Sequence, residues 1–310
     1  MTGLGQRLAD SGYALGWSVV KRLPEPVATA VFRRIADIVW RRRGGSVHQL
    51  EANLGRVLGP DATPERIRQV SRASMRSYLR YYQEAFRLPV WDRETVLTRM
   101  ECDLTLLDKC STRGKGVIFA LPHMGNWDHA GAWITLKGYP FTTVAERLKP
   151  ESLYKRFLDY RESLGMEVLP LTGGDGNTFG TLARRLREGR LLCLLSDRDL
   201  TAGGVPVTFF GEPTRMAAGP AALAVQTGAA LIPVTLAWDG KVMRGTLHPE
   251  IEVPAEGSRR EKVAAMTQAV ADAYARAIAR DPQDWHMLQP LWLADLDARR
   301  LARIGHGGAQ

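Results

Sequence analysis

The sequence predicts an α/β protein with a mostly parallel, mixed central sheet flanked by helices. From residue 116 onward, short apolar runs alternate with helical patterns, which is typical of parallel sheets with crossover helices. The run 117–121, VIFAL, is apolar throughout, as expected of a strand buried on both faces. Asp239-Gly240 separates two further apolar runs and predicts a hairpin at an antiparallel edge.

The remaining elements follow from the same patterns. The expected strands are 117–121, 141–145, 166–169, 191–195, 205–210, 230–237 and 241–247, and the expected helices are 151–164, 178–188, 218–227 and 258–280. Ser258 and Glu261 form a capping box for the last helix, and Asp281-Pro282 ends it. The alternation predicts a single domain whose α/β core spans 96–300 behind a helical segment at 1–95, with a flexible tail at 301–310.

The pattern of residues 1–95 predicts a helical segment that faces a membrane. Helical patterns cover 4–23, 26–43 and 64–88, and Val27, Val31, Ile35 and Ile38 repeat on one face of the second. Eight Lys and Arg against three Asp and Glu lie in residues 1–50, with Trp17, Phe32 and Trp40 beside them. This pattern favours amphipathic helices lying on an anionic membrane. The alternative is an ordinary helical pair packed on the core with a solvated basic side.

The size, charge and cysteine content of the chain exclude several classes of function. The chain has 310 residues, 45% hydrophobic content and a net charge of +9, so it can bury a large core and should meet anionic partners. Its three cysteines show no CxxC or Cys/His pattern, which favours a reducing compartment and argues against a disulfide scaffold or structural zinc. No nucleic-acid-binding motif is present. The beginning of the chain lacks the shape of a signal peptide, and glycine and proline divide the longest uncharged stretch, 216–238.

His123 is the candidate general base. It follows Pro122 at the carboxyl end of the strand 117–121, where open α/β sheets bind ligands. Asp128 lies in the first turn of the next helix and could accept a hydrogen bond from the His123 ring. The alternative is that His123 merely caps this helix. The neighbouring His129 is expected on the helix surface.

Two further polar groups are expected near this edge. Asp197 and Asp199 follow the strand 191–195, so Asp197 is a second candidate to orient His123, unless Arg198 holds both carboxylates in a structural ion pair. Arg215 lies near the start of the helix 218–227, a favourable place to bind an anion.

The positions of the serines and histidines limit the reaction classes that the chain could catalyse. No serine lies in a G-x-S-x-G elbow, and the six histidines form neither HExxH nor a local cluster, so no metal site is predicted. A base without a protein nucleophile points to direct attack by a substrate hydroxyl, a class that includes acyl transfer from a thioester. Backbone N–H groups near His123 would then stabilise the oxyanion.

Several stretches together resemble a known family. HMGNWD (123–128) is similar to the HX4D motif of glycerolipid acyltransferases, and FFGEPTRMAAGP (209–220) and ALIPV (230–234) resemble their third and fourth blocks. LLCLLSDRD (191–199) resembles the strand-Asp-x-Asp segment of the lipid A acyltransferase branch. FTTVAERLKPESLY, FLDYRESLGMEVLPLTGG and DWHMLQP are similar to the phosphatidylinositol mannoside acyltransferases of actinobacteria.

This resemblance implies transfer of a palmitoyl group from acyl-CoA, without further cofactor. The implied acceptor is the 6-hydroxyl of the mannose on inositol position 2 of a mono- or dimannosylated phosphatidylinositol, at the cytoplasmic face of the plasma membrane. It implies His123 as base with Asp128 as its motif partner. Asp197 falls where a glutamate is expected in the mycobacterial enzymes. Glu146, Arg161 and His286 match acceptor-site positions. The alternatives are acyl transfer to another lipid or glycolipid, and a membrane-binding protein without activity.

Overall fold

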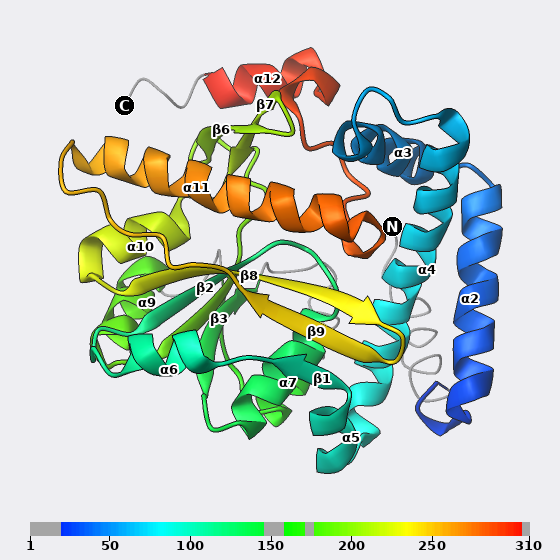
Figure 1. Cartoon of the computed structure of the whole chain (residues 1–310), viewed down its shortest axis with the longest axis horizontal. Helices are drawn as coiled ribbons and strands as arrows, with labels where there is room; N and C mark the ends of the chain where they lie inside the picture. The colour runs from blue at the N-terminus through cyan, green and yellow to red at the C-terminus, as the bar shows by residue number, and fades with distance from the viewer. Residues whose placement is uncertain (1–19, 146–157, 171–176, 306–310) are drawn as a thin grey trace, which may run out of the picture.

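The computed structural model describes residues 20–145, 158–170 and 177–305 (Figure 1). The helices are α2 (Glu25–Arg41), α3 (Gly45–Leu58), α4 (Pro64–Arg87), α5 (Arg93–Thr98), α6 (Thr105–Ser111), α7 (Trp127–Leu136), α9 (Thr178–Arg187), α10 (Gly219–Thr227), α11 (Arg259–Arg280) and α12 (Ala298–Gly305). The strands are β1 (Met100–Cys102), β2 (Val117–Leu121), β3 (Phe141–Ala145), β4 (Glu167–Pro170), β5 (Leu191–Leu195), β6 (Val205–Phe209), β7 (Glu212–Met216), β8 (Ala230–Asp239) and β9 (Val242–Leu247).

The central sheet has seven strands in the order β1-β9-β8-β2-β5-β3-β4. Every neighbouring pair is parallel except β8 and β9, which confirms the predicted mixed, mostly parallel α/β fold. The hairpin is not the edge that the sequence predicts, because β1 pairs with the outer side of β9. A strand of three residues gives too short a pattern to be recognised. β2 therefore lies in the interior of the sheet, between β5 and β8.

A two-stranded antiparallel sheet of β6 and β7 stands apart from the central sheet. The predicted strand 205–210 is confirmed as β6, and its partner β7 is a strand that the sequence did not predict. Phe209 pairs with Glu212, so Phe210 and Gly211 form a two-residue turn in which both residues have positive φ, +50° and +79°. Pro213 and the charged residues of β7 hide its strand character in the sequence.

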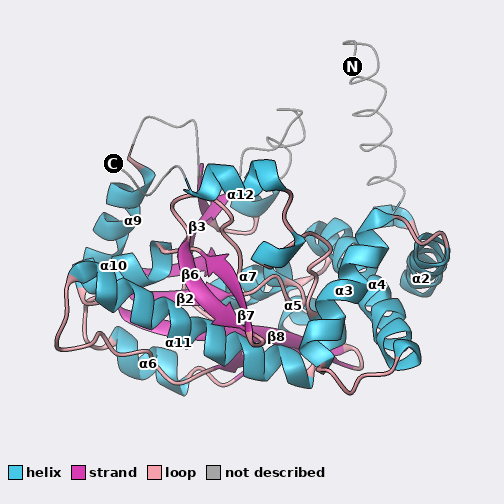
Figure 2. Ribbon diagram, turned by 90° about the horizontal axis from the view of Figure 1, so that it is seen from above, coloured by secondary structure: helices cyan, strands magenta, loops and turns pink. Residues whose placement is uncertain are grey.

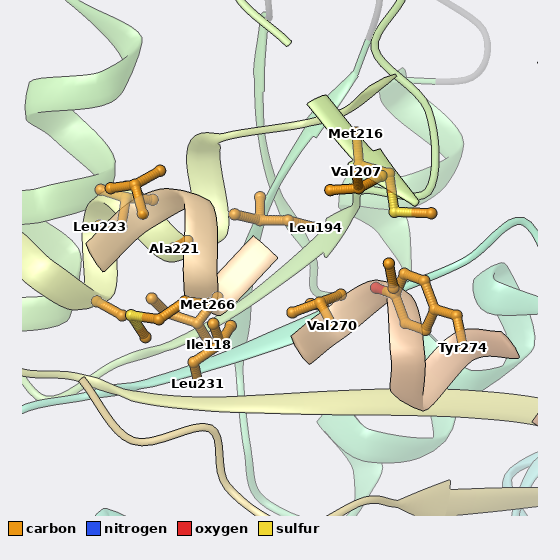
Figure 3. Packing of buried hydrophobic residues seen from close by; sticks show 14 of the residues in the cluster. Ile118, Leu194, Val207, Met216, Ala221, Leu223, Leu231, Met266, Val270 and Tyr274 are labelled. Atoms are coloured by element: carbon orange, nitrogen blue, oxygen red, sulfur yellow. The ribbon is translucent and has the colours of Figure 1, made fainter. Parts of the chain in front are cut away.

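Helices cover both faces of the central sheet (Figures 1 and 2). On one face, Ile118 and Leu194 pack with α9, α10 and α11 in a large apolar cluster (Figure 3). On the other face, Phe119 and Leu121 pack with α5, α6 and α7 in a second cluster. Alternate residues of each central strand thus enter opposite layers, as expected of strands buried on both sides.

The N-terminal helices form a layer of their own, with α4 between α2 and the sheet (Figures 1 and 2). Asp37 of α2 accepts paired hydrogen bonds from Arg72 and Arg76 of α4 at 2.7–3.0 Å. These guanidinium groups lower the pKa of the Asp37 carboxyl. The sequence reading missed α3, which packs on α4 through Leu50 and Leu54.

The outer face of α2 carries the predicted apolar stripe. Val27, Val31, Ile35 and Ile38 are each between 37% and 46% exposed. The aromatic residues named beside the basic ones, Phe32 and Trp40, contact α4 instead: Phe32 packs edge-on against Phe86, and Trp40 donates its indole N–H to Ser71. The predicted helix 4–23 and Trp17 lie largely outside the described residues. Within the described ranges, no helix has both the length and the apolar character needed to cross a bilayer.

Candidate active site

A tight turn at the end of β2 positions His123. Pro122 ends the strand, and Gly125 adopts a φ of +64° before α7 begins at Trp127. A Cβ on Gly125 would lie 2.6 Å from the Cβ of Leu236, so the turn can press against β8 only with glycine at this position. Asn126 then caps α7, accepting a hydrogen bond from the backbone N–H of His129 at 3.0 Å.

His123 and Asp197 form a hydrogen-bonded pair across the ends of neighbouring strands. The ring Nδ1 lies 2.6 Å from Asp197 Oδ1, while 38% of the His123 side chain is exposed. β2 and β5 are adjacent and parallel, so their carboxyl ends place both residues at one edge. With an ionised carboxylate accepting at Nδ1, this nitrogen carries the hydrogen and Nε2 keeps its lone pair.

Burial and charge act in opposite directions on this pair. Burial opposes an imidazolium, but the adjacent Asp197 carboxylate outweighs it and raises the pKa of His123 above its ordinary value. Asp197 is fully buried. Burial by itself would raise its pKa, yet the charge of His123 and the hydrogen bonds from His123 and Trp285 lower the pKa overall. Asp197 is therefore the ionised member of the pair.

Asp128 does not hold the His123 ring. Its carboxylate accepts from Arg161 Nε at 2.7 Å and from the Tyr81 hydroxyl at 2.9 Å. Burial, and then the nearby Asp128 charge, raise the pKa of Tyr81, so the hydroxyl stays a donor. The suggestion that Asp128 orients His123 is wrong, because Asp128 points from the first turn of α7 toward α4 and residues 158–163 instead. This contact joins Asp128 to Arg161, for which the family resemblance implies a position in the acceptor site.

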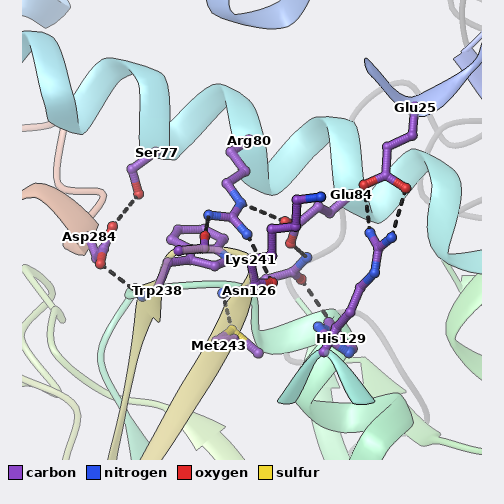
Figure 4. Close-up of polar contacts among 12 residues, drawn as sticks. Glu25, Ser77, Arg80, Glu84, Asn126, His129, Trp238, Lys241, Met243 and Asp284 are labelled. Atoms are coloured by element: carbon purple, nitrogen blue, oxygen red, sulfur yellow. Dashed lines mark hydrogen bonds and ion pairs between the residues drawn. The ribbon is translucent and has the colours of Figure 1, made fainter. Parts of the chain in front are cut away.

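His129 is buried, contrary to the surface position expected for it. Its Nε2 lies 2.9 Å from the carbonyl oxygen of Val96, because α5 packs across this face of α7. The cap residue Asn126 is buried as well and donates to Glu84 of α4 at 3.0 Å (Figure 4). Buried polar contacts therefore fix the first turn of α7 to the helical layer, a link that no sequence motif indicates.

His286 lies in an aromatic environment behind His123. Its Nε2 lies 2.9 Å from the Ser77 hydroxyl oxygen, and the Ser77 hydroxyl donates its single hydrogen to Asp284 at 2.8 Å, so Nε2 is the donor to Ser77. The other ring nitrogen, Nδ1, is buried without a hydrogen-bond partner. Burial, followed by the nearness of His123, lowers the pKa of His286 to about 3. Burial raises the pKa of Asp284 to about 6. His286 is therefore a neutral ring at ordinary pH.

The other predicted binding residues are placed differently. Arg215 lies on β7, and its guanidinium donates to the carbonyl oxygens of Thr201, Ala202 and Gly204. It thereby organises the loop that follows Asp197, and its predicted role in anion binding stays a prediction. Glu146 lies outside the described residues. Arg198 Nη1 donates to Gln289.

Backbone N–H groups of the turn are occupied by the protein itself. The N–H of His123 donates to Asp197 at 3.0 Å, that of Gly125 to the Asp284 carbonyl at 2.9 Å, and that of Asn126 to the Met243 sulfur at 3.2 Å. These groups build the turn, so the expectation that they stabilise an oxyanion is not supported.

An apolar pocket opens beside this site, between the sheet and α7. Trp127 and Asp128 line it together with side chains of six neighbouring strands. Those strands contribute Met100, Cys102, Phe119, Leu121, Phe141, Thr143, Val144, Cys193, Leu195, Val234, Leu236 and Leu247. The Trp127 ring also contacts His123 edge-on at 5.6 Å, so the pocket begins next to the base.

No set of three His, Cys, Asp or Glu side chains in the described ranges comes together as metal ligands would. The described side chains around His123 offer one ionised carboxylate, a neutral imidazole nitrogen and an apolar pocket. This arrangement suits proton abstraction from a hydroxyl beside a long apolar group.

Comparison with known proteins gives the family. Residues 5–294 match the sequence model of the bacterial lipid A biosynthesis acyltransferases. The chain belongs to this family. It is 49% identical over 305 residues to the phosphatidylinositol mannoside acyltransferase of Mycolicibacterium smegmatis, covering 97% of both chains. It is also 49% identical over 300 residues to the enzyme of that name from Mycobacterium tuberculosis, covering 95% of this chain and 92% of the relative.

These relatives agree with the resemblance found in the motifs, and membership of an acyltransferase family identifies the chain as an enzyme. The sequence reading singled out His123 and Asp197, which the structure brings into contact. It missed Tyr81, Glu84 and Trp285, the partners of the site residues. They are aromatic or charged side chains within ordinary amphipathic or irregular segments, where the residue type alone indicates no role.

Proposed function

We propose that this protein transfers a palmitoyl group from acyl-CoA to the 6-hydroxyl of the mannose on inositol position 2 of phosphatidylinositol mannosides. The observation that carries the proposal is the partly exposed His123 imidazole, held by Asp197 next to an apolar pocket. The identity to two phosphatidylinositol mannoside acyltransferases over nearly the whole chain supports the acceptor class.

The reaction needs a general base and a negative charge that stabilises the protonated form of this base. His123 Nε2 takes the proton of the sugar hydroxyl as the alcohol oxygen attacks the thioester carbonyl carbon. The carbon–sulfur bond then breaks, and the departing thiolate receives the proton from the imidazolium. Asp197, already ionised, stabilises the imidazolium between these two steps. Atoms and charge balance without a covalent intermediate on the protein.

The apolar pocket suits the acyl chain. Its lining comes almost entirely from apolar side chains, with Asp128 and Arg161 as the charged members. Burial of each methylene contributes about 0.8 kcal/mol, so a long chain binds favourably and also keeps water away from the thioester. Arg161, paired with Asp128, offers a fixed positive charge to the polar acceptor beside the same pocket.

Both substrates are lipids, and the outer face of α2 suits contact with an anionic membrane. Its exposed apolar stripe is accompanied by the exposed Arg33, Arg34 and Arg41. Apolar side chains flanked by arginines match a leaflet with negative headgroups. We place the enzyme at the cytoplasmic face of the plasma membrane on this ground and on the nature of its substrates.

The same chemistry on another lipid or glycolipid acceptor is the second candidate, because the family model describes lipid A biosynthesis. Mass spectrometry of products from palmitoyl-CoA with mono- or dimannosylated phosphatidylinositol, phosphatidylinositol and a lysophospholipid separates the two. We expect one added palmitoyl group on the mannosylated lipids only. Acylation of phosphatidylinositol or the lysophospholipid in preference to the mannosides would replace the proposed acceptor.

A substitution at the base tests the mechanism. His123→Gln should reduce acyl transfer by roughly a thousandfold or more, because no nearby group replaces the base. His48→Gln, on the exposed surface of α3, is the matched control and should leave the rate unchanged. Vesicle binding without thioester consumption by the unaltered protein, with every acceptor, would instead identify a lipid-binding protein.

A further inference from the structure

A short C-terminal segment, residues 284–286, is joined to the turn that carries His123. The backbone N–H of His286 donates to the His123 carbonyl at 2.7 Å, and the Asp284 carbonyl accepts from the N–H of Gly125 at 2.9 Å. Met124 and Trp285 form an antiparallel bridge between these contacts. The segment therefore lies on the turn as a short strand would.

The side chain in the middle of this segment reaches the carboxylate that supports the base. The indole Nε1 of Trp285 donates to Asp197 Oδ2 at 3.1 Å. The same oxygen accepts from the backbone N–H of His123 at 3.0 Å, while Oδ1 faces the His123 ring at 2.6 Å. Two donors on one oxygen fix the plane of the carboxylate and leave the other oxygen for the imidazole.

Packing prevents the indole from moving away. Trp285 is fully buried and contacts Phe209 and Trp292 edge-on, with ring centroids 6.0 and 6.2 Å away. The Ser74 hydroxyl donates to the Trp285 carbonyl at 3.4 Å and holds the backbone from the other side. The donor is thus set by the core between the small sheet and the central sheet, independently of any substrate.

We propose that Trp285 is a positioning residue for the reaction, acting through Asp197 to set both the orientation and the basicity of the His123 ring. This inference rests on the proposed function as far as catalysis is concerned. The effect on the ring itself can be measured without turnover.

The direction of the effect follows from the charge on the pair. The indole bonds more strongly to Asp197 when His123 is neutral, because the carboxylate charge is then not offset by an imidazolium. Removing the indole N–H therefore destabilises the neutral-ring state more than the protonated one. The pKa of His123 should rise, and a carboxylate with one donor fewer should hold the ring less firmly.

The other charged groups facing His123 are unchanged by this substitution. Arg198 lowers the tendency of His123 to protonate, and the nearby His286 is neutral at ordinary pH. Neither Arg198 nor His286 takes part in the hydrogen bond between the Trp285 indole and Asp197. A shift in the pKa of His123 after removal of the indole N–H can therefore be assigned to the loss of this donor.

Trp285→Phe removes the donor and keeps an aromatic ring, and Trp292→Phe is the matched control. Trp292 is equally buried and its indole also makes one hydrogen bond, but to the Phe209 carbonyl at 2.9 Å. We expect Trp285→Phe to lower kcat roughly tenfold and to move the acidic limb of the pH profile upward by about half a pH unit. The KM for acyl-CoA should stay near its original value. Trp292→Phe should leave the midpoint of this limb unchanged.

NMR titration of the imidazole signal that disappears in His123→Gln gives the same midpoint without turnover. In the unaltered protein, the Trp285 indole N–H signal should titrate together with His123, so a poorly folded variant does not prevent the test. A Trp285→Phe midpoint equal to that of Trp292→Phe, or an indole signal that ignores the His123 titration, would overturn the inference. Absence of acyl transfer by the unaltered enzyme would refute the proposed function instead, and the NMR result would still decide on Trp285.

Discussion

A single buried carboxylate decides the chemical character of His123. Asp197 receives three hydrogen-bond donors, two of them from His123 itself and one from Trp285. Asp128, which shares the HX4D motif with His123, instead joins α7 to Arg161 and Tyr81. Asp197 therefore supports the base, whereas Asp128 stabilises the packing of α7 against its neighbours.

The pH dependence of the reaction should report the His123–Asp197 pair. The base must be neutral, and Asp197 raises the pKa of His123 above 6.5, so kcat/KM should increase with pH through a midpoint above that value. Asp197→Asn removes the negative charge, and burial then dominates, which should move the midpoint below 6.5. It should also lower kcat roughly a hundredfold. Rates measured between pH 5 and 9 provide the test, and an unmoved midpoint in Asp197→Asn would contradict it.

Asp128→Asn should lower the free energy of unfolding and leave the pKa of His123 unchanged. It leaves the largely buried Arg161 guanidinium without its negative partner, at an expected cost of about 3 kcal/mol in the free energy of unfolding. Urea unfolding measures this loss, with Asp61→Asn on the exposed loop after α3 as the control. The midpoint of the acidic limb should stay in place. A shift comparable to that of Asp197→Asn would show that Asp128 also governs the base.

At the scale of elements, the junction of β2 and α7 is the most constrained part of the chain. The turn is closed by Gly125 against Leu236, by the Asn126 cap and by the segment 284–286. The sequence predicted the strand, the start of the helix and the position of His123. It could not predict the partners, because Glu84 and Trp285 lie 42 residues before Asn126 and 88 residues after Asp197 respectively.

Gly125→Ala should disrupt this junction. The added Cβ would meet both the side chain and the backbone of Leu236, at 2.6 and 2.9 Å, and the positive φ adds strain. We expect a loss of about 2 kcal/mol or more in unfolding free energy, together with reduced turnover. Gly114→Ala has a similar positive φ, +67°, but open space around it, so it isolates the strain. Equal losses in both variants, measured by urea unfolding, would argue against a close contact at Gly125.

At the scale of the whole molecule, the sheet separates two apolar layers, and the pocket lies in only one of them. The layer of α9, α10 and α11 packs around Ile118 and Leu194, whereas the pocket lies in the layer of α7, beside Trp127. Next to the sheet, α4 carries α2 with its exposed apolar stripe (Figure 1). The exposed apolar stripe of α2 and the apolar pocket are thus connected through one helix.

Membrane binding should depend on the outer face of α2. Val31→Asp together with Ile35→Asp places two negative charges in the exposed stripe, and we expect roughly tenfold weaker binding to vesicles containing anionic phospholipid. Val253→Asp is a control at a comparably exposed valine outside α2. Cosedimentation at low and high salt measures the effect. Equal binding by the double variant and the unaltered protein would exclude α2 as the contact.

The sequence by itself determined the strands of the core, the α/β class, the candidate base and the acyltransferase family, because apolar periodicity and short motifs are local properties. Only the tertiary structure decided that Asp197, and not Asp128, holds His123, that Arg215 supports a loop, and that His129 is buried. Each of these depends on which side chain meets another from a distant part of the chain. That choice is made by strand order and helix packing, which no local pattern encodes.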